Sequence, residues 1–315
     1  MPAIPLITSL PPRMSRPLPD GREFGAEYQA MCIASWREAG FSEIVSVNSR
    51  RELEALPQIY DLAKANGVRV VAVERDAAET VGKAYAYVSD IFGVGAELAG
   101  DGTVAFVNAD IMLGASPRVA DLVAANVGPG QFAVARRVPV DRPGAATGEP
   151  YYWGFDFFAG DAREFAAVPD IGLIVGCHWW DHLMPALMCW AGARMVHIEE
   201  PVVIHLEHEE RSGEDIRARL GQRFLDELRR VAAGGTWKSE TAALYMQGLE
   251  RAVKDQSGRP IRDLAAALRR RLPTYAKTEQ HYMLHRLAMH CVSFIDSYKT
   301  SSNPTNIQNR AERAF

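Results

Sequence analysis

Thr103-Val104-Ala105-Phe106-Val107-Asn108-Ala109-Asp110 is the stretch of sequence that decides the fold. Its first five residues are β-branched or apolar without interruption, which is typical of a strand buried on both faces of a parallel sheet. The run then ends in an amide and a carboxylate. The sequence therefore predicts polar side chains at the carboxyl edge of that sheet, which is where open α/β sheets bind their ligands.

Strand and helix patterns alternate over the residues before this stretch. Each expected strand is a short apolar run, and each expected helix has apolar residues at helical spacing. Repeated βαβ units predict a mainly parallel sheet with helices on both faces. We expect residues 68–73 to be buried on both faces, and the second helix to be kinked at Pro57. The expected strands are residues 4–10, 44–47 and 68–73, and the expected helices are residues 28–36, 53–63 and 81–92.

The pattern changes after residue 130. A helix is expected from about Gly176 to Ala191, and the chain after Ser212 is expected to be helical. The organisation predicted is one α/β domain over residues 1–210, a helical region over 211–299 and a flexible tail over 300–315. Further strands are expected at residues 132–138, 152–158, 194–198 and 202–206, the last two being separated by Pro201.

Composition indicates an ordinary globular protein. The 315 residues are 48% hydrophobic and 23% charged, which excludes disorder, collagen and a disulfide scaffold. We expect no transmembrane helix and no signal peptide, because the sequence has no apolar run of 18 residues and no basic segment at its start. Four cysteines without CxxC spacing favour reduced thiols and a cytoplasmic location.

Charge is distributed unevenly. Residues 1–210 carry 16 Lys and Arg against 28 Asp and Glu, whereas residues 211–315 carry 19 against 11. The basic region could dock on an anionic membrane or a lipid-linked acceptor, or it could be a solvated helical face. Nucleic acid is not expected as a partner, because no recognisable module interleaves the basic residues with aromatic ones.

The common phosphate-binding and hydrolase motifs are missing from the sequence. Pro11-Pro12-Arg13 follows the first strand in place of a glycine-rich loop, so neither a Rossmann dinucleotide site nor a P-loop is predicted. The sequence has no G-x-S-x-G nucleophile elbow either. A ligand must therefore be bound by other groups at the strand ends.

Asp110 and His205 are the candidate metal ligands. A carboxylate at a strand end can hold Mg²⁺ or Mn²⁺, which take one or two protein carboxylates and complete their shell with phosphate and water. An imidazole beside the carboxylate suits manganese. The alternatives are a turn or helix-capping role for Asp110 and a buried, hydrogen-bonded histidine at 205.

Asp181 is the candidate general base. It stands at an expected helix start beside Trp179 and Trp180, and sugars stack on aromatic rings while a carboxylate accepts a proton. The alternative is a tryptophan pair in the core with Asp181 capping its helix. His178 and His182 have the spacing of helical zinc ligands, but Trp179 stands where the metallopeptidase motif needs glutamate.

Asp156 is a single acid among aromatic residues in the expected strand 152–158. It is either a sheet-edge hydrogen-bonding residue or a contact for hydroxyl groups of a ligand, and the second interpretation is slightly favoured.

The order of these parts resembles that of GT-A fold glycosyltransferases over about residues 4–210. The similarity lies in an early Ile7-Thr8-Ser9-Leu10 strand, Val47-Asn48 and Glu74 at the next two strand ends, and Asn108-Ala109-Asp110 as a degenerate DxD motif. The resemblance implies a nucleotide diphosphate-sugar donor and a divalent metal held by Asp110 and His205, with Asn108 replacing the first acid. It implies a base at Asp181 and acceptor contacts at Asp156, Trp179 and Trp180. The implied donor-binding residues are Thr8, Ser9, Arg13, Asn48, Glu74, Lys83, Asn108 and Asp110.

The sequence thus predicts an enzyme, a glycosyltransferase that moves a sugar to a hydroxyl of a glycan or lipid-linked acceptor in polysaccharide biosynthesis. Two alternatives remain open. One is a sugar-nucleotide nucleotidyltransferase, for which Pro11-Pro12-Arg13 is a poor version of the usual basic loop. The other is a sugar-binding protein with a decayed site, which Asn108 makes plausible.

Overall fold

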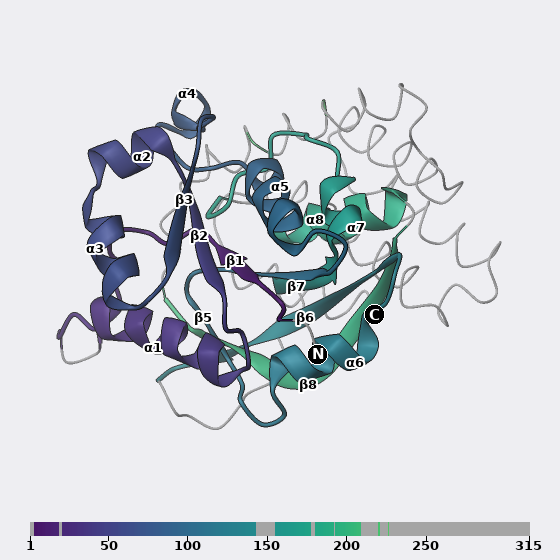
Figure 1. Cartoon of the computed structure of the whole chain (residues 1–315). Helices are drawn as coiled ribbons and strands as arrows, with labels where there is room; N and C mark the ends of the chain where they lie inside the picture. Colours follow the sequence, from purple (N-terminus) through teal and green to yellow (C-terminus); the bar gives the residue numbers. More distant parts are fainter. Residues whose placement is uncertain are drawn as a thin grey trace, which may run out of the picture.

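The structure is a computed structural model of the chain. It describes residues 3–18, 21–142, 155–177, 180–191 and 193–208, together with Leu220 and Asp226. A single eight-stranded sheet runs through the described part, and helices lie on both of its faces (Figure 1).

The strands have the spatial order β3-β2-β1-β4-β7-β6-β8-β5. The pairs β1–β2, β2–β3, β1–β4 and β6–β8 are parallel, whereas β4–β7, β6–β7 and β5–β8 are antiparallel. The predicted α/β fold, with a mixed and mainly parallel sheet flanked by helices, is therefore confirmed. The strands are β1 (Leu6–Thr8), β2 (Ile44–Ser49), β3 (Arg69–Val73), β4 (Thr103–Val107), β5 (Ile111–Leu113), β6 (Gln131–Val140), β7 (Phe155–Asp161) and β8 (Arg194–Leu206).

Two apolar cores flank the sheet, one on each face. Val104 and Phe106 of β4 belong to one core, and Ala105 and Val107 belong to the other, because alternate residues of a strand point to opposite faces. Helices α5, α7 and α8 contribute to the first core, and α1, α3 and α6 to the second. The helices are α1 (Gly25–Glu38), α2 (Arg50–Ala55), α3 (Gln58–Ala65), α4 (Ala78–Val81), α5 (Val88–Ala99), α6 (Val119–Asn126), α7 (Ala162–Ala166) and α8 (Trp180–Ala191).

Two strand predictions were wrong in detail. β3 is the edge strand of the sheet, so its residues are half-buried or exposed rather than buried on both faces. The two strands expected around Pro201 form one long strand, β8. The pairing of β8 with β6 is broken between Ile198 and Val203, since Pro201 has no N–H to donate to the ladder.

The helix predictions differ from the structure at two turns. Pro57 divides the helix expected over residues 53–63 into α2 and α3, in line with the predicted kink. The stripe expected over residues 81–92 spans two helices. α4 ends at Val81 and is followed by Gly82, which has a positive φ of 73°. Glycine adopts this conformation without strain and so ends the helix, and α5 begins only at Val88.

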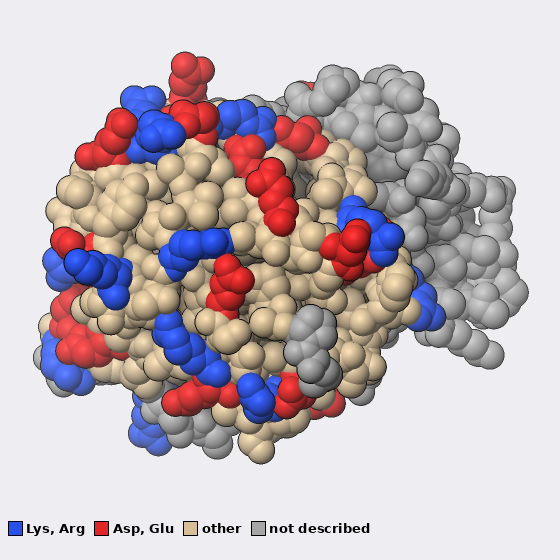
Figure 2. All heavy atoms as spheres, in the orientation of Figure 1, with Lys and Arg blue, Asp and Glu red and all other residues tan. Residues whose placement is uncertain are grey.

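Several predictions fall outside the described residues. These are the helices after residue 211 with the tail, the domain boundaries there, the membrane contact of that basic region, and His178 and Trp179. Among the described helices, none has the length and apolar character that a membrane span needs. On the face of the described part that Figure 2 shows, acidic and basic side chains are interspersed.

Candidate metal and donor site

The site lies where the chain reverses its direction of winding across the sheet. From β1 the chain passes to β2 and β3 on one side, and it then returns to β4 on the other side of β1. At such a switch point the connections after neighbouring strands diverge and leave a crevice for a ligand. Asp110 follows β4, and the loop carrying Arg16 follows β1.

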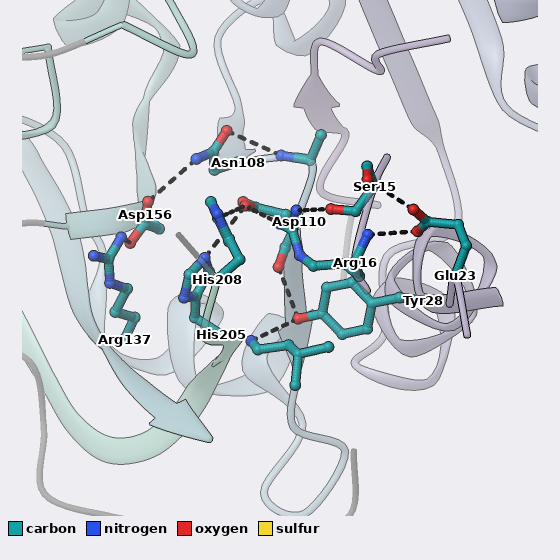
Figure 3. A network of polar contacts seen from close by, with 12 residues as sticks. Ser15, Arg16, Glu23, Tyr28, Asn108, Asp110, Arg137, Asp156, His205 and His208 are labelled. Carbon is teal, nitrogen blue, oxygen red and sulfur yellow. Dashed lines mark hydrogen bonds and ion pairs between the residues drawn. The ribbon is translucent and has the colours of Figure 1, made fainter. Parts of the chain in front are cut away.

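Asp110 is the centre of a polar cluster drawn in Figure 3. Its Oδ2 lies 2.8 Å from Nη2 of Arg16, 3.2 Å from Nε2 of His205 and 3.5 Å from Nε2 of His208. One ligand atom each from Asp110, His205 and His208 lie within 4.8 Å of one another. The predicted pair of Asp110 and His205 is thus brought together, and His208 joins it.

The second oxygen of Asp110 is left for a ligand. Oδ1 is buried and has no hydrogen-bond partner in the described part of the structure. A buried carboxylate oxygen without a partner costs free energy, so it calls for a cation or a donor that the chain does not supply. One carboxylate with two imidazoles is a donor set that divalent transition metals accept, manganese included.

Strand pairing positions the two histidines. β5 begins one residue after Asp110 and pairs antiparallel with β8, so that Ile111 stands opposite His205. His208 follows the end of β8, and its ring centroid lies 5.2 Å from that of His205. The sequence analysis missed β5, because three residues are too few to show a period.

Helix α1 anchors this segment with side chains buried in the second core. The hydroxyl of Tyr28 donates to the carbonyl of Asp110 at 2.9 Å and accepts from the N–H of Leu206 at 2.9 Å. The indole of Trp36 donates to the carbonyl of Ile111 at 2.7 Å. Burial raises the pKa of Tyr28, so its hydroxyl keeps the proton that it donates. The backbone on both sides of the site is therefore fixed before any ligand arrives.

Glu23 fixes the loop that carries Arg16. Its Oε1 accepts from the backbone N–H of Arg16 at 2.5 Å and of Gly25 at 2.9 Å, and its Oε2 accepts from the hydroxyl of Ser15 at 2.7 Å. The hydrogen bond from Arg16, followed by those from Ser15 and Gly25, lowers the pKa of Glu23 to about 2. At neutral pH Glu23 is consequently an ionised clamp on this loop.

Asp110 is ionised despite its surroundings. Burial raises the pKa of this carboxyl, but hydrogen bonds from His205 and His208 and the charges of His205 and Arg16 outweigh burial, so the pKa lies well below its usual range. An ionised carboxylate is the form that binds a cation.

Asn108 and Asp156 form a second polar group beside Asp110 (Figure 3). The side-chain amide of Asn108 donates to Oδ1 of Asp156 at 3.3 Å, and Nη1 of Arg137 donates to Oδ2 of Asp156 at 3.1 Å. Asp156 is only 2% exposed, and its partner Arg137 is half-buried, so this ion pair joins β6 to the start of β7. The structure thus places Asp156, an expected acceptor contact, next to Asn108 of the expected donor site.

The other predicted donor residues divide into two groups. The first group lies at the ends of β1 and β2. Thr8 is buried, and its Oγ1 has no hydrogen-bond partner within the part of the chain that the structure describes. Asn48 donates from Nδ2 to the carbonyl of Leu10 at 3.0 Å and to Oε2 of Glu52 at 2.9 Å. Asn48 therefore ties the loop after β1, which includes Ser9, to α2. Burial raises the pKa of Glu52.

The second group of predicted donor residues lies on the surface. Glu74, beyond the edge strand β3, forms an ion pair with Arg50, and Lys83 lies with its ammonium 5.4 Å from the ring centroid of Tyr85. Arg13 is exposed in the loop after β1. The ion pair of Glu74 thus lies beyond β3, which β2 and β1 separate from β4.

Trp180 and Asp181 begin helix α8. Trp180 is 3% exposed, and its ring centroid lies 5.3 Å from Phe106 and 5.9 Å from Phe158. Its ring thus packs in the first core, as in the alternative interpretation of a core tryptophan. It offers little surface for an acceptor to stack on. Asp181 lies in the first turn of α8 and is half-buried.

Sequence reasoning missed Arg16, His208 and Tyr28. The spacing His205-Leu206-Glu207-His208 is a signal that could have identified the second histidine. Arg16 lies in a loop that has no periodic pattern. Tyr28 was predicted only as one of the apolar residues of a helix. Their roles depend on strand pairing that no local pattern reveals.

Comparisons with known proteins describe the fold. No family model matches the chain, and no curated protein matches it. Residues 1–349 of S. aureus TarS, solved with UDP-GlcNAc, are similar at 11% identity and a TM-score of 0.48, over 96% of this chain and 93% of that one. A putative glucose-1-phosphate thymidylyltransferase from Bacillus anthracis, solved with sucrose, is similar at 10% identity and a TM-score of 0.40, over 63% and 87%. Rv0371C from Mycobacterium tuberculosis, solved with manganese, is similar at 14% identity and a TM-score of 0.39, over 69% and 97%.

Fold and site together define a class. The described part of the chain is an α/β protein with a cluster of one carboxylate and two imidazoles at the carboxyl edge of its sheet. Identities and scores this low assign no activity, so the function has to be argued from the residues of the site.

Proposed function

We propose that the protein is a metal-assisted glycosyltransferase that moves a sugar from a nucleotide diphosphate-sugar donor to an acceptor hydroxyl. The observation that carries this proposal is the cluster of Asp110, His205 and His208 beside the switch point of the sheet. Glycosyl transfer needs the leaving diphosphate to be neutralised and the acceptor hydroxyl to lose a proton.

Asp110, His205 and His208 would hold the divalent cation, Mn²⁺ or Mg²⁺. Their donor atoms are close enough to share one ion, and Oδ1 of Asp110 has no hydrogen-bond partner among the described residues. Two imidazoles favour Mn²⁺ over Mg²⁺, which prefers oxygen ligands. The ion would supply positive charge against the diphosphate leaving group.

The remaining tasks fall to groups of the chain itself. Arg16 adds a guanidinium, which pairs well with phosphate oxygens. Asp181 is the proposed base that accepts the proton of the acceptor hydroxyl, because it is a half-buried carboxylate at a helix start. Asp156 is held by Arg137 and Asn108, and it would fix the side chains of these two residues at the edge of the site.

One observation favours a second candidate, a sugar nucleotidyltransferase. The sequence contains only a poor version of a basic loop after the first strand, but Arg16 of that loop reaches Asp110. Such an enzyme would join a nucleoside triphosphate to a sugar phosphate and release pyrophosphate.

One experiment separates these activities. The full chain is incubated with Mn²⁺ and either a panel of nucleotide sugars with glycan acceptors or nucleoside triphosphates with sugar 1-phosphates. We expect nucleoside diphosphate release in the first set, loss of it in Asp110→Asn, and no change in Asp121→Asn, an exposed acid of α6. Pyrophosphate release in the second set alone would favour the nucleotidyltransferase. Binding of a nucleotide sugar without turnover would favour a sugar-binding protein.

A further inference from the structure

The guanidinium of Arg16 lies next to the Asp110 carboxylate. It thus puts a positive charge where a bound cation would put one. Its side chain is 9% exposed, and its Nη2 lies 2.8 Å from Oδ2 of Asp110. Nη1 donates to the carbonyl of Ser15 at 3.0 Å. The third nitrogen, Nε, is buried and has no hydrogen-bond partner in the described part of the structure.

Two unsatisfied polar atoms therefore belong to the two partners of one ion pair. Nε of Arg16 needs an acceptor, and Oδ1 of Asp110 needs a cation or a donor. The guanidinium is positive, the carboxylate is negative, and the two already form an ion pair through Oδ2 of Asp110. A single additional cation or anion therefore cannot satisfy both groups. A divalent cation together with a diphosphate can.

Charge leads to the same ligand pair. Asp110 and Arg16 cancel each other, so a divalent ion added alone would lie beside an unscreened guanidinium and be repelled. A diphosphate with two or three negative charges would balance the ion and the guanidinium together. Guanidinium also binds phosphate oxygens in two parallel hydrogen bonds.

We propose that Arg16 is an internal counter-ion that competes with the metal for Asp110 and passes to the donor diphosphate when the metal binds. This inference rests on the proposed function, since it names a regulation of the same site. In the ligand-free protein Arg16 neutralises the buried carboxylate. With both ligands present the guanidinium leaves Asp110 to the ion and pairs with a phosphate oxygen. The protein would therefore bind the ion weakly until the diphosphate is present.

The loop is built for such a role. Glu23 accepts from the backbone N–H of Arg16 and from the side-chain hydroxyl of Ser15, so that a change of partner involves only the arginine side chain. The guanidinium also lies 5.7 Å from the ring centroid of Tyr28, a cation–π contact that supports it beside Asp110.

Mn²⁺ alone tests the competition. Binding to the full chain is measured by the electron paramagnetic resonance signal of free Mn²⁺, in wild type, Arg16→Met, Arg16→Lys and Arg22→Met. Arg22 is an exposed arginine of the same loop and gives the matched loss of charge. We expect Arg16→Met to bind Mn²⁺ alone about tenfold more tightly than wild type, with Arg22→Met unchanged. Arg16→Lys keeps the charge, so it should stay near wild type, and it guards against misfolding of the methionine variant.

UDP at saturating Mn²⁺ tests the transfer of the guanidinium. Isothermal titration should give about tenfold weaker UDP binding for Arg16→Met than for wild type. Equal or weaker Mn²⁺ binding by Arg16→Met, or equal UDP binding, would overturn the inference while leaving the proposed metal site intact. Absence of Mn²⁺ binding in every variant, with and without UDP, would overturn the proposed function as well.

Discussion

The hydroxyl of Tyr28 joins the two segments that form the metal cluster, and replacing it with phenylalanine tests that frame. Tyr28→Phe removes only the oxygen that donates to the carbonyl of Asp110 and accepts from the N–H of Leu206. The N–H of Leu206 is buried and would be left unpaired, and the half-buried carbonyl of Asp110 would lose its hydrogen bond. One unpaired buried group and one lost hydrogen bond together cost about 2 to 4 kcal/mol of unfolding free energy.

Urea unfolding followed by fluorescence measures this loss. The matched control is Tyr60→Phe, because Tyr60 is 48% exposed. We expect the control to change stability by less than about 0.5 kcal/mol. A loss as small as that in Tyr28→Phe would refute the reasoning, since it would mean that the hydroxyl does not hold the two segments together.

Three further substitutions test the base, the loop clamp and the start of α1. Asp181→Asn should keep donor binding and lower transfer about 100-fold, because asparagine keeps the shape of the side chain but takes no proton. Transfer within a few-fold of wild type, in a radiolabel assay, would leave Asp181 with a structural role in the first turn of α8. Glu23→Gln should be less stable than wild type at about pH 7. The difference in stability should shrink as the pH falls from 4.5 to about 2, because the lowered pKa of Glu23 stabilises the fold in full only above this range. A difference in stability that persists at about pH 2 in thermal melts would contradict this. Gly25→Ala should destabilise the protein by about 1 to 3 kcal/mol, since a Cβ there would lie 2.2 Å from the carbonyl oxygen of Met14. Gly93→Ala in α5, where a Cβ meets nothing within 4 Å, should instead stabilise it, and equal effects in urea unfolding would argue against the contact.

The strand end at Asp110 could be predicted because its signal is local. Residues 103–107 form an uninterrupted apolar run, and the polar residues after it follow directly in the chain. The βαβ alternation before it fixes the parallel part of the sheet, and through it the edge at which Asp110 lies.

The rest of the site depends on contacts between distant segments. The histidines reach Asp110 because β5 pairs with β8, and β5 is only three residues long. Arg16 is placed by hydrogen bonds of a loop, which leave no periodic pattern in the sequence. β3 lies at the edge because of the order of strands in the sheet. The apolar composition of residues 68–73 gives no information on that order. Trp180 has the composition of either a core residue or a sugar platform, and only its packing against Phe106 distinguishes the two.

The proposed metal site can be tested by the anomalous scattering of manganese in crystals of the full chain grown with Mn²⁺ and UDP. We expect one anomalous peak within bonding distance of Asp110, His205 and His208, with the diphosphate of UDP against that peak and the nucleoside along the ends of β1 and β2. A manganese peak away from these three side chains, or UDP bound at another edge of the sheet, would contradict it.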